Sequence, residues 1–349
     1  MPTRVLDLGE SGTQRFISLH QPDSNDVSAY AALSYCWGGP QTCTTTNANL
    51  SRRLRSIPAS ELPQTITDAV TVTRKLGIRY LWVDALCIIQ DNTDDWRTEA
   101  SLMHKVYSGA HITISADCSA SASQGFLHSR SERHRTAVPL PWTTSTGKTV
   151  GLYVCPYFKE FPIEMMSSPL GQRGWTFQER ALSRRILHFG SELMYWECKE
   201  ACVGEDKARP VYSAQDPFRH FYELLSPFPP EADPTWPNSK WPAALRIHCQ
   251  WAAAISIYSR RTLKYGLDKS PALEGLARAF DEKGTLGKYI GGLWWDGFHR
   301  HLLWHCAQAE GVTKRSSVYR QASPVGLHFQ KAVLTQAHCQ GAIMVLVIN

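Results

Sequence analysis

The sequence predicts an α/β sandwich built on a parallel sheet. Apolar runs predict strands at 30–37, 79–89 and 111–116, and segments with helical spacing lie between them at 64–76 and 94–107. The order strand, helix, strand, helix, strand is typical of a sheet whose helices cover both faces. From residue 81 onward the middle strand is apolar except for one acid, as a central strand covered on both sides requires.

Each of these elements has a recognisable end. The first strand runs into a tight loop at 38–40, and helix 64–76 is followed by Gly77 at the position of a C-cap. Asp94 or Asp95 can serve as N-cap of the next helix. Apolar residues recur on that helix every three or four positions and form one stripe: Trp96, Ala100, Met103 and Tyr107.

Inserted β-hairpins and a mostly helical region are predicted farther along the chain. In order, the pattern predicts a loop at 117–135, a hairpin at 136–156, a short helix at 173–185, a hairpin turned at Gly190, and helical segments at 243–281 and 291–306. The expected divisions are an α/β domain at 1–204 with its core at 28–190, a Pro-rich excursion or hinge at 205–242, a helical region at 243–310 and an atypical tail at 311–349.

Composition limits the classes of function. The chain has 349 residues, 43% of them hydrophobic, enough for one large domain or two modest ones. Its net charge of +6 comes from scattered basic residues, and neither a long basic stripe nor a known reading motif supports nucleic-acid binding. The motifs G-x-S-x-G, H-E-x-x-H and G-x-G-x-x-G and the P-loop are absent, which argues against the common hydrolase, zinc-protease, dehydrogenase and nucleotide-triphosphate classes.

The chain is expected to be cytoplasmic. Its N-terminus lacks the pattern of a signal peptide, and nowhere do 18 apolar residues run together. The 10 cysteines are then expected to be reduced and mostly buried, with Cys87 as an inert core thiol. Cys198 and Cys202 have no matching pair at zinc-finger spacing, so no metal site is predicted.

Polar and aromatic residues gather where two predicted strands end. Gln90 and Asp91 follow the middle strand, and Tyr35, Trp37 and Gly38 close the first one. Parallel sheets collect ligands beyond the carboxyl ends of their strands, and aromatic faces there can stack on a ligand ring. Core packing is the alternative for Trp37.

Four blocks of the chain resemble the fungal heterokaryon-incompatibility, or HET, domain. They are YAALSYCWG at 30–38, LPQTITDAV at 62–70, LWVDALCIIQD at 81–91 with WRTEASLMHKVYSGA at 96–110, and RGWTFQERALSRRILHF at 173–189. They occur in the family's order, and the resemblance extends over roughly residues 28–306. The chain departs from the family after that point, because members commonly continue into a β-rich region whereas this one closes with an atypical sequence. We therefore expect that the C-terminal sequence is truncated or altered.

The resemblance implies a role in non-self recognition between fungal individuals that ends in growth arrest or cell death. It also implies a distant similarity to Toll/interleukin-receptor (TIR) domains, some of which cleave the glycosidic bond of NAD. No cofactor is required by this interpretation, and NAD is considered only as a substrate. The expected partners are a second copy of the chain and another incompatibility-type protein.

Three carboxylates are candidates for chemistry. NAD hydrolysis needs a carboxylate near the ribose to stabilise an oxocarbenium-like transition state, and Glu179 or Glu99, each beside the buried stripe of a predicted helix, could supply it. Asp84 lies inside the apolar middle strand, where a charge is costly unless donors or cations meet it. The alternative for Asp84 is a structural salt bridge, to an Arg such as Arg173, or a set of hydrogen bonds. For Glu99 and Glu179 the alternative is a helix cap or an ion pair.

The shared-cleft hypothesis follows from these placements. It brings together the residues at the strand ends and polar residues of the later helix: Tyr35, Trp37, Gly38, Gln90, Asp91, Arg173, Trp175, Gln178 and Glu179. Three functions remain open from sequence alone. They are a signalling effector that acts by association, an NAD-cleaving enzyme, and a small-molecule biosynthetic enzyme on the same fold.

Overall fold

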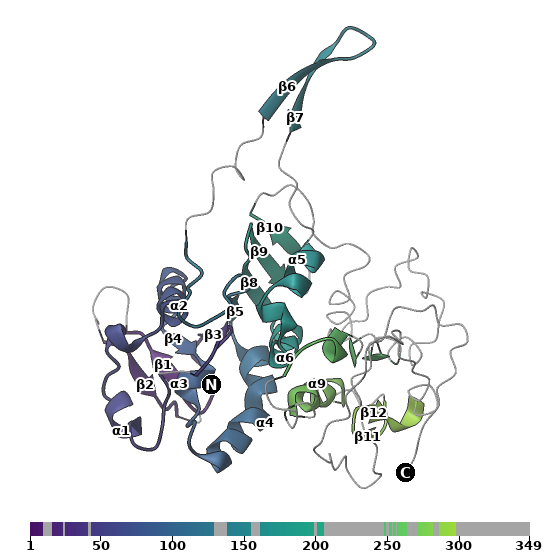
Figure 1. Cartoon of the computed structure of the whole chain (residues 1–349). Coiled ribbons are helices and arrows are strands. Elements are labelled where there is room, and N and C mark those ends of the chain that lie inside the picture. Colours follow the sequence, from purple (N-terminus) through teal and green to yellow (C-terminus); the bar gives the residue numbers. More distant parts are fainter. Residues whose placement is uncertain are drawn as a thin grey trace.

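The structure is a computed structural model (Figure 1). It describes residues 1–9, 16–23, 25–40, 43–128, 138–154, 161–198, 201–205, 248, 251–252, 254–255, 257–263, 268, 271–281 and 286–297. Most of the predicted Pro-rich excursion and all of the predicted tail lie outside these residues.

An eight-stranded mixed sheet forms the centre of the fold, in the order β10-β9-β8-β5-β3-β4-β1-β2. Its parallel strands are β3 (Tyr30–Ser34), β4 (Tyr80–Trp82), β5 (Ile112–Ser115) and β8 (Arg185–Phe189). Antiparallel strands extend both edges, with β1 (Val5–Asp7) and β2 (Ser18–His20) on one side and β9 (Met194–Cys198) and β10 (Cys202–Gly204) on the other. The α/β prediction is confirmed, as is the hairpin turned at Gly190.

Helices connect and cover these strands. The described ones are α1 (Leu50–Arg53), α2 (Gln64–Lys75), α3 (Asp84–Cys87), α4 (Thr93–Gly109), α5 (Phe161–Ser167), α6 (Trp175–Leu182) and α9 (Pro271–Asp281), with short 3-10 turns η1 (Ala59–Glu61), η3 (Leu170–Gln172) and η5 (Trp295–Gly297). Helix α9 packs against α4 and α6, so the later part of the chain contacts the α/β domain. The C-cap of α2 is Leu76, and Gly77, predicted for that position, follows it with a φ of 71°, the left-handed conformation that ends a helix.

The N-cap predicted for α4 is wrong by a few residues. Asn92 is the N-cap, and its side-chain oxygen accepts from the N–H groups of Asp94 and Asp95, each over 3.1 Å. The predicted apolar stripe of α4 is buried at Met103 and Tyr107 and half-buried at Trp96 and Ala100.

The long middle strand is a second correction. β4 ends at Trp82, and Asp84–Cys87 fold into the helical turn α3. After this turn, Ile89 forms an isolated parallel bridge with Thr45, outside the named strands. The apolar sequence is buried almost throughout. The apolar composition therefore predicted the burial of this segment correctly, but it could not distinguish a strand from a buried helical turn.

The helix predicted at 291–306 is a third correction. Its described part forms a hairpin of β11 (Tyr289–Ile290) and β12 (Leu293–Trp294), followed by η5. Gly291 and Gly292 have φ values of 53° and 103°, and two central residues with positive φ suit a tight hairpin turn. Residues 298–306 lie outside the described part of the chain.

Candidate functional site

Polar residues follow three neighbouring parallel strands. Ser34 is the last residue of β3, Asp84 lies two residues beyond β4, and Asp117 lies two residues beyond β5. Because β4, β3 and β5 are adjacent and parallel, these side chains reach the same edge of the sheet. This is the edge where α/β folds place ligands.

Asp84 is held by hydrogen bonds from two sides. Trp37 Nε1 donates to one carboxylate oxygen over 2.8 Å, and the Ala85 N–H donates to the other over 2.7 Å. Burial raises the pKa of Asp84, while the Trp37 hydrogen bond and the positive charge of Arg173 oppose that rise. The prediction that this acid would be hydrogen-bonded is confirmed.

Arg173 precedes α6 and faces the end of β3. Its Nη1 donates to the Tyr35 carbonyl oxygen over 2.8 Å. The charges of Cys36, Glu179 and Asp84 all act on the guanidinium and keep its pKa above the usual value despite burial. Arg173 is therefore the cation between the two carboxylates of this edge.

Glu179 lies on α6 and is buried against the end of β3. The Ser34 hydroxyl donates to its carboxylate. Burial raises the pKa of Glu179 to about 7, and the negative charge of Asp84 adds to the rise, whereas Ser34, Arg173 and Tyr107 oppose it. The site therefore holds a carboxylic acid that changes charge near neutral pH. We call Ser34, Trp37, Asp84, Arg173 and Glu179 the edge cluster.

Some of the other predicted site residues lie beside the edge cluster, and others lie elsewhere. Tyr35 joins it, since burial first and then the Asp84 charge raise the pKa of its hydroxyl well above the usual range. Gln90 lies beside it, because its Nε2 donates to the Asp84 carbonyl oxygen over 3.1 Å. Gly38 lets the loop after β3 pack closely against Ser121, because a Cβ at position 38 would clash with that residue.

Asp91, Trp175 and Gln178 have their partners elsewhere. Exposed Asp91 accepts from the Asn47 N–H over 2.8 Å, and Trp175 Nε1 donates to Asp268 over 3.3 Å. Gln178 is buried between α4 and α9, and when its amide nitrogen is assigned toward the Ala272 carbonyl and its amide oxygen toward the His104 N–H, each hydrogen bond measures 3.1 Å.

Glu99 belongs to a different part of the molecule. Its carboxylate is 3.4 Å from Arg4, whose guanidinium also pairs with Asp95 over 2.6 Å. Burial raises the pKa of Glu99, and Arg4 opposes that rise. Cys87 is a buried thiol whose pKa burial raises to about 12, as expected for an inert core cysteine.

Sequence reasoning missed a second buried network beside the edge cluster. His188 bridges two carboxylates, with Nδ1 at 2.8 Å from Asp117 and Nε2 at 2.8 Å from Glu197. Arg180 completes it with two hydrogen bonds of 2.8 and 2.7 Å to Glu197. We call Asp117, His188, Glu197 and Arg180 the relay network.

Charge pairing sets the protonation states of the relay network. Asp117 and Glu197 raise the pKa of His188 to about 9 against the effect of its burial. Arg180 and His188 lower the pKa of Glu197 to about 2, again against its burial. The one sequence signal was an acid two residues beyond a strand end, which occurs at Asp117 as it does at Asp84.

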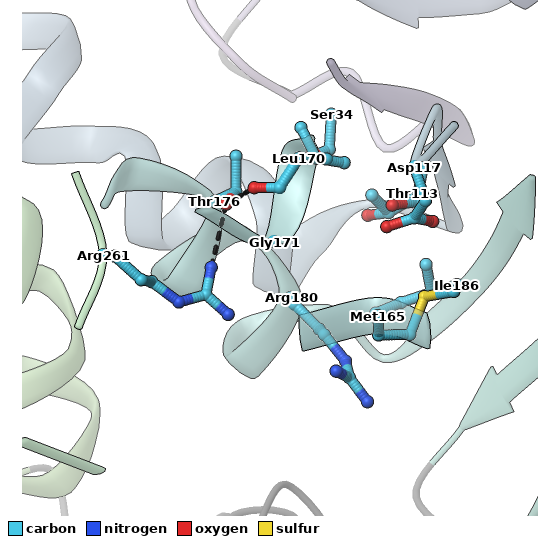
Figure 2. Close-up of a pocket in the computed structure, with 11 residues that line it drawn as sticks. Ser34, Thr113, Asp117, Met165, Leu170, Gly171, Thr176, Arg180, Ile186 and Arg261 are labelled. Carbon is cyan, nitrogen blue, oxygen red and sulfur yellow. Dashed lines mark hydrogen bonds between the residues drawn. The ribbon is translucent and has the colours of Figure 1, made fainter. Parts of the chain in front are cut away.

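A small pocket lies between the two networks (Figure 2). Ser34, Thr113, Asp117, Arg180 and Arg261 are among the residues that line it. Its volume is about 20 Å³, which is room for one water molecule and not for a nicotinamide ring.

Arg261 reaches the pocket from beyond the Pro-rich stretch and donates to Thr176 over 2.9 Å. Burial, with the nearby charge of Arg180, lowers the pKa of Arg261 to about 9. Within the described ranges, His, Cys, Asp and Glu side chains form no group of three that could hold a metal ion. No helix in this part of the chain is both long and apolar enough to cross a bilayer.

These features define an α/β domain with charged side chains buried at the carboxyl ends of its parallel strands. Residues 30–179 match the family model described as Heterokaryon incompatibility protein (HET), so the chain contains a HET domain. The match begins with β3 and ends at Glu179, and it therefore includes the whole edge cluster. No curated protein and no solved structure matches the chain. The HET domain implies a role related to heterokaryon incompatibility.

Proposed function

We propose that this protein is a cytoplasmic signalling effector in fungal non-self recognition, and that its HET domain acts by association with a second copy or with another incompatibility-type protein. The outcome of that signal is growth arrest or cell death. The observation that carries the proposal is that the charged residues at this edge of the HET domain hydrogen-bond to protein groups, and that the pocket beside them has a volume of about 20 Å³.

The contacts of the edge cluster support a structural role. The carboxylate of Asp84 accepts from Trp37 and Ala85, and that of Glu179 accepts from Ser34. Buried polar groups that are satisfied inside the protein fix the relative positions of the elements that carry them. The edge cluster thus joins β3, the turn after β4, and α6 into one rigid unit, which suits a domain that presents a surface to a partner.

NAD cleavage is the second candidate, and one observation favours it. Glu179 has a pKa of about 7 and contacts Ser34, which also lines the pocket. A carboxyl group of this kind can act as an acid or base, and the TIR resemblance supplies the reaction. A substrate would require the pocket to open well beyond its present volume.

Inducible expression in a fungal host separates the two functions. Growth and cellular NAD are measured for the wild-type chain and for Glu179→Gln, with the soluble amount of each protein as the control. The proposal predicts that both chains arrest growth while NAD stays constant. Absence of arrest with the wild-type chain, or a fall in NAD that Glu179→Gln abolishes, would overturn it.

A further inference from the structure

One hairpin stands away from the eight-stranded sheet. It consists of β6 (Val138–Thr143) and β7 (Thr149–Val154), and Figure 1 shows it projecting from the rest of the molecule. Among the described residues these strands form a sheet of their own, with two strands. A lone two-stranded hairpin is only marginally stable in water. This one also exposes 58% of Trp142.

The two edges of this hairpin differ in their hydrogen-bonding groups. The Thr144 N–H donates to the Lys148 carbonyl over 2.9 Å, which fixes the alternation of inward and outward groups along the ladder. Three cross-strand pairs then have outward N–H positions: Thr143 with Thr149, Pro141 with Gly151, and Pro139 with Tyr153.

Proline removes donors from only one edge. Pro139 and Pro141 have no N–H, so the outer edge of β6 keeps only the N–H of Thr143 and is a poor partner for a further strand. Thr149, Gly151 and Tyr153 keep their N–H groups, so the outer edge of β7 can. Neither strand contains a charged residue, and charges are a usual protection of an exposed edge.

We propose that β7 pairs antiparallel with β7 of a second copy of this chain, about a two-fold axis at Gly151. This inference rests on the proposed function and names the surface through which association occurs. A second copy fits because the uncharged edge of β7 presents the same N–H and C=O groups to its own symmetry mate. The resulting sheet has β6 at both outer edges, where the prolines disfavour further addition. Assembly therefore stops at a dimer and does not continue into a fibre.

The dimer depends on protein concentration. The contact between two strands of six residues is small, and small interfaces are typical of weak and transient association. Such an interface fits a signal that begins when the concentration of the effector rises locally.

Proline at one Thr–Thr pair tests the edge directly. Thr149→Pro removes an N–H from the β7 edge in both copies, and Thr143→Pro makes the same change at its cross-strand partner on the edge that is already poor in donors. Sedimentation equilibrium of the full chain over a concentration series gives the dimer dissociation constant. We expect Thr149→Pro to raise that constant by about tenfold or more and Thr143→Pro to leave it unchanged.

Cysteine cross-linking tests the same contact by the gain of a covalent dimer and not by the loss of dimerisation. Gly151→Cys places two Cys residues opposite each other at the two-fold axis, where the Cα separation of a hydrogen-bonded antiparallel pair, about 5.5 Å, suits a disulfide. We expect mild oxidation to give a cross-linked dimer with this variant, and not with Pro141→Cys or the wild-type chain.

The outcomes separate the surface from the function. If the wild-type chain dimerises, both proline variants dimerise equally well and both cysteine variants cross-link equally, the β7 surface is overturned and association is left intact. A wild-type chain that stays monomeric at every concentration would overturn both.

Discussion

The edge cluster and the relay network lie side by side, yet their carboxylates behave in opposite ways. Glu197 of the relay network is buried and has a pKa of about 2, because Arg180 and His188 both face it. Glu179 of the edge cluster is buried and has a pKa of about 7, because desolvation and the charge of Asp84 outweigh Ser34 and Arg173. Burial alone therefore does not decide the charge of an acid. The balance of cations and like charges around it does.

Removing the central anion of the relay network should have the largest effect. Glu197→Gln leaves the His188 and Arg180 charges buried with one anion fewer, and breaking such a pair costs about 3 to 5 kcal/mol. Urea unfolding at pH 6 measures the change. Glu61→Gln is the matched control, because its pair with Arg52 is at the surface and should shift the midpoint much less.

The relay network also predicts a pH window. The pKa of Glu197 is lowered from 4.5 to about 2, so its contribution is present above pH 4.5 and lost as the pH falls through 2. The pKa of His188 is raised from 6.5 to about 9, so its contribution is present below pH 6.5 and lost as the pH rises through 9. The wild-type advantage over Glu197→Gln should peak between these limits, and an advantage independent of pH would contradict the charge assignment.

Glu179→Gln should alter stability in a different pH range. The pKa of Glu179 is raised from 4.5 to about 7, so the wild-type protein loses stability as the pH rises through 7, by up to about 3 kcal/mol. Glutamine does not ionise, so the variant should lack this loss and gain relative to wild type at pH 8 to 9. Parallel stability curves of the two chains from pH 5 to 9 would show that Glu179 is already ionised at pH 5.

Trp37→Phe should have an intermediate effect. It removes a donor from Asp84, and an unsatisfied buried acceptor costs about 1 to 3 kcal/mol. Thermal unfolding detects the change, and Trp142→Phe, at an exposed position, is the control. Equal small shifts in both variants would mean that Asp84 does not depend on the indole.

Ser34→Ala should give the smallest change in stability, roughly 1 kcal/mol, with a diagnostic shift in pH dependence. The Ser34 hydrogen bond lowers the pKa of Glu179, so without it the pH-linked loss of stability should move above pH 7. The midpoint of that loss in urea unfolding is the measurement. A downward movement would contradict the contact.

Sequence patterns predicted the parts of the site that depend on local signals. The parallel strands and the helices between them, the hairpin turned at Gly190 and the place of Glu179 beside the first strand followed from apolar runs, turn residues and family blocks. The end of β4 at Trp82 and the hairpin of β11 and β12 did not, because an apolar run fits a strand, a helix or a buried turn equally well. The relay network needed more, because His188 and Glu197 come from separate strands and Arg180 from a helix. Only the register of β8 on β9 and the packing of α6 bring them together, and neither leaves a pattern in one sequence. Likewise, nothing local showed that Gln178 would face α9.

The most direct test of the account uses the purified full chain and NAD. Nicotinamide release is measured at dilute and crowded protein concentrations, for wild type and for Glu179→Gln, with melting temperatures measured in parallel. If the buried carboxylates organise the HET domain and association carries the signal, as proposed, the wild type should release no more nicotinamide than the variant at either concentration. Release that rises with crowding and disappears in Glu179→Gln at an unchanged melting temperature would contradict it.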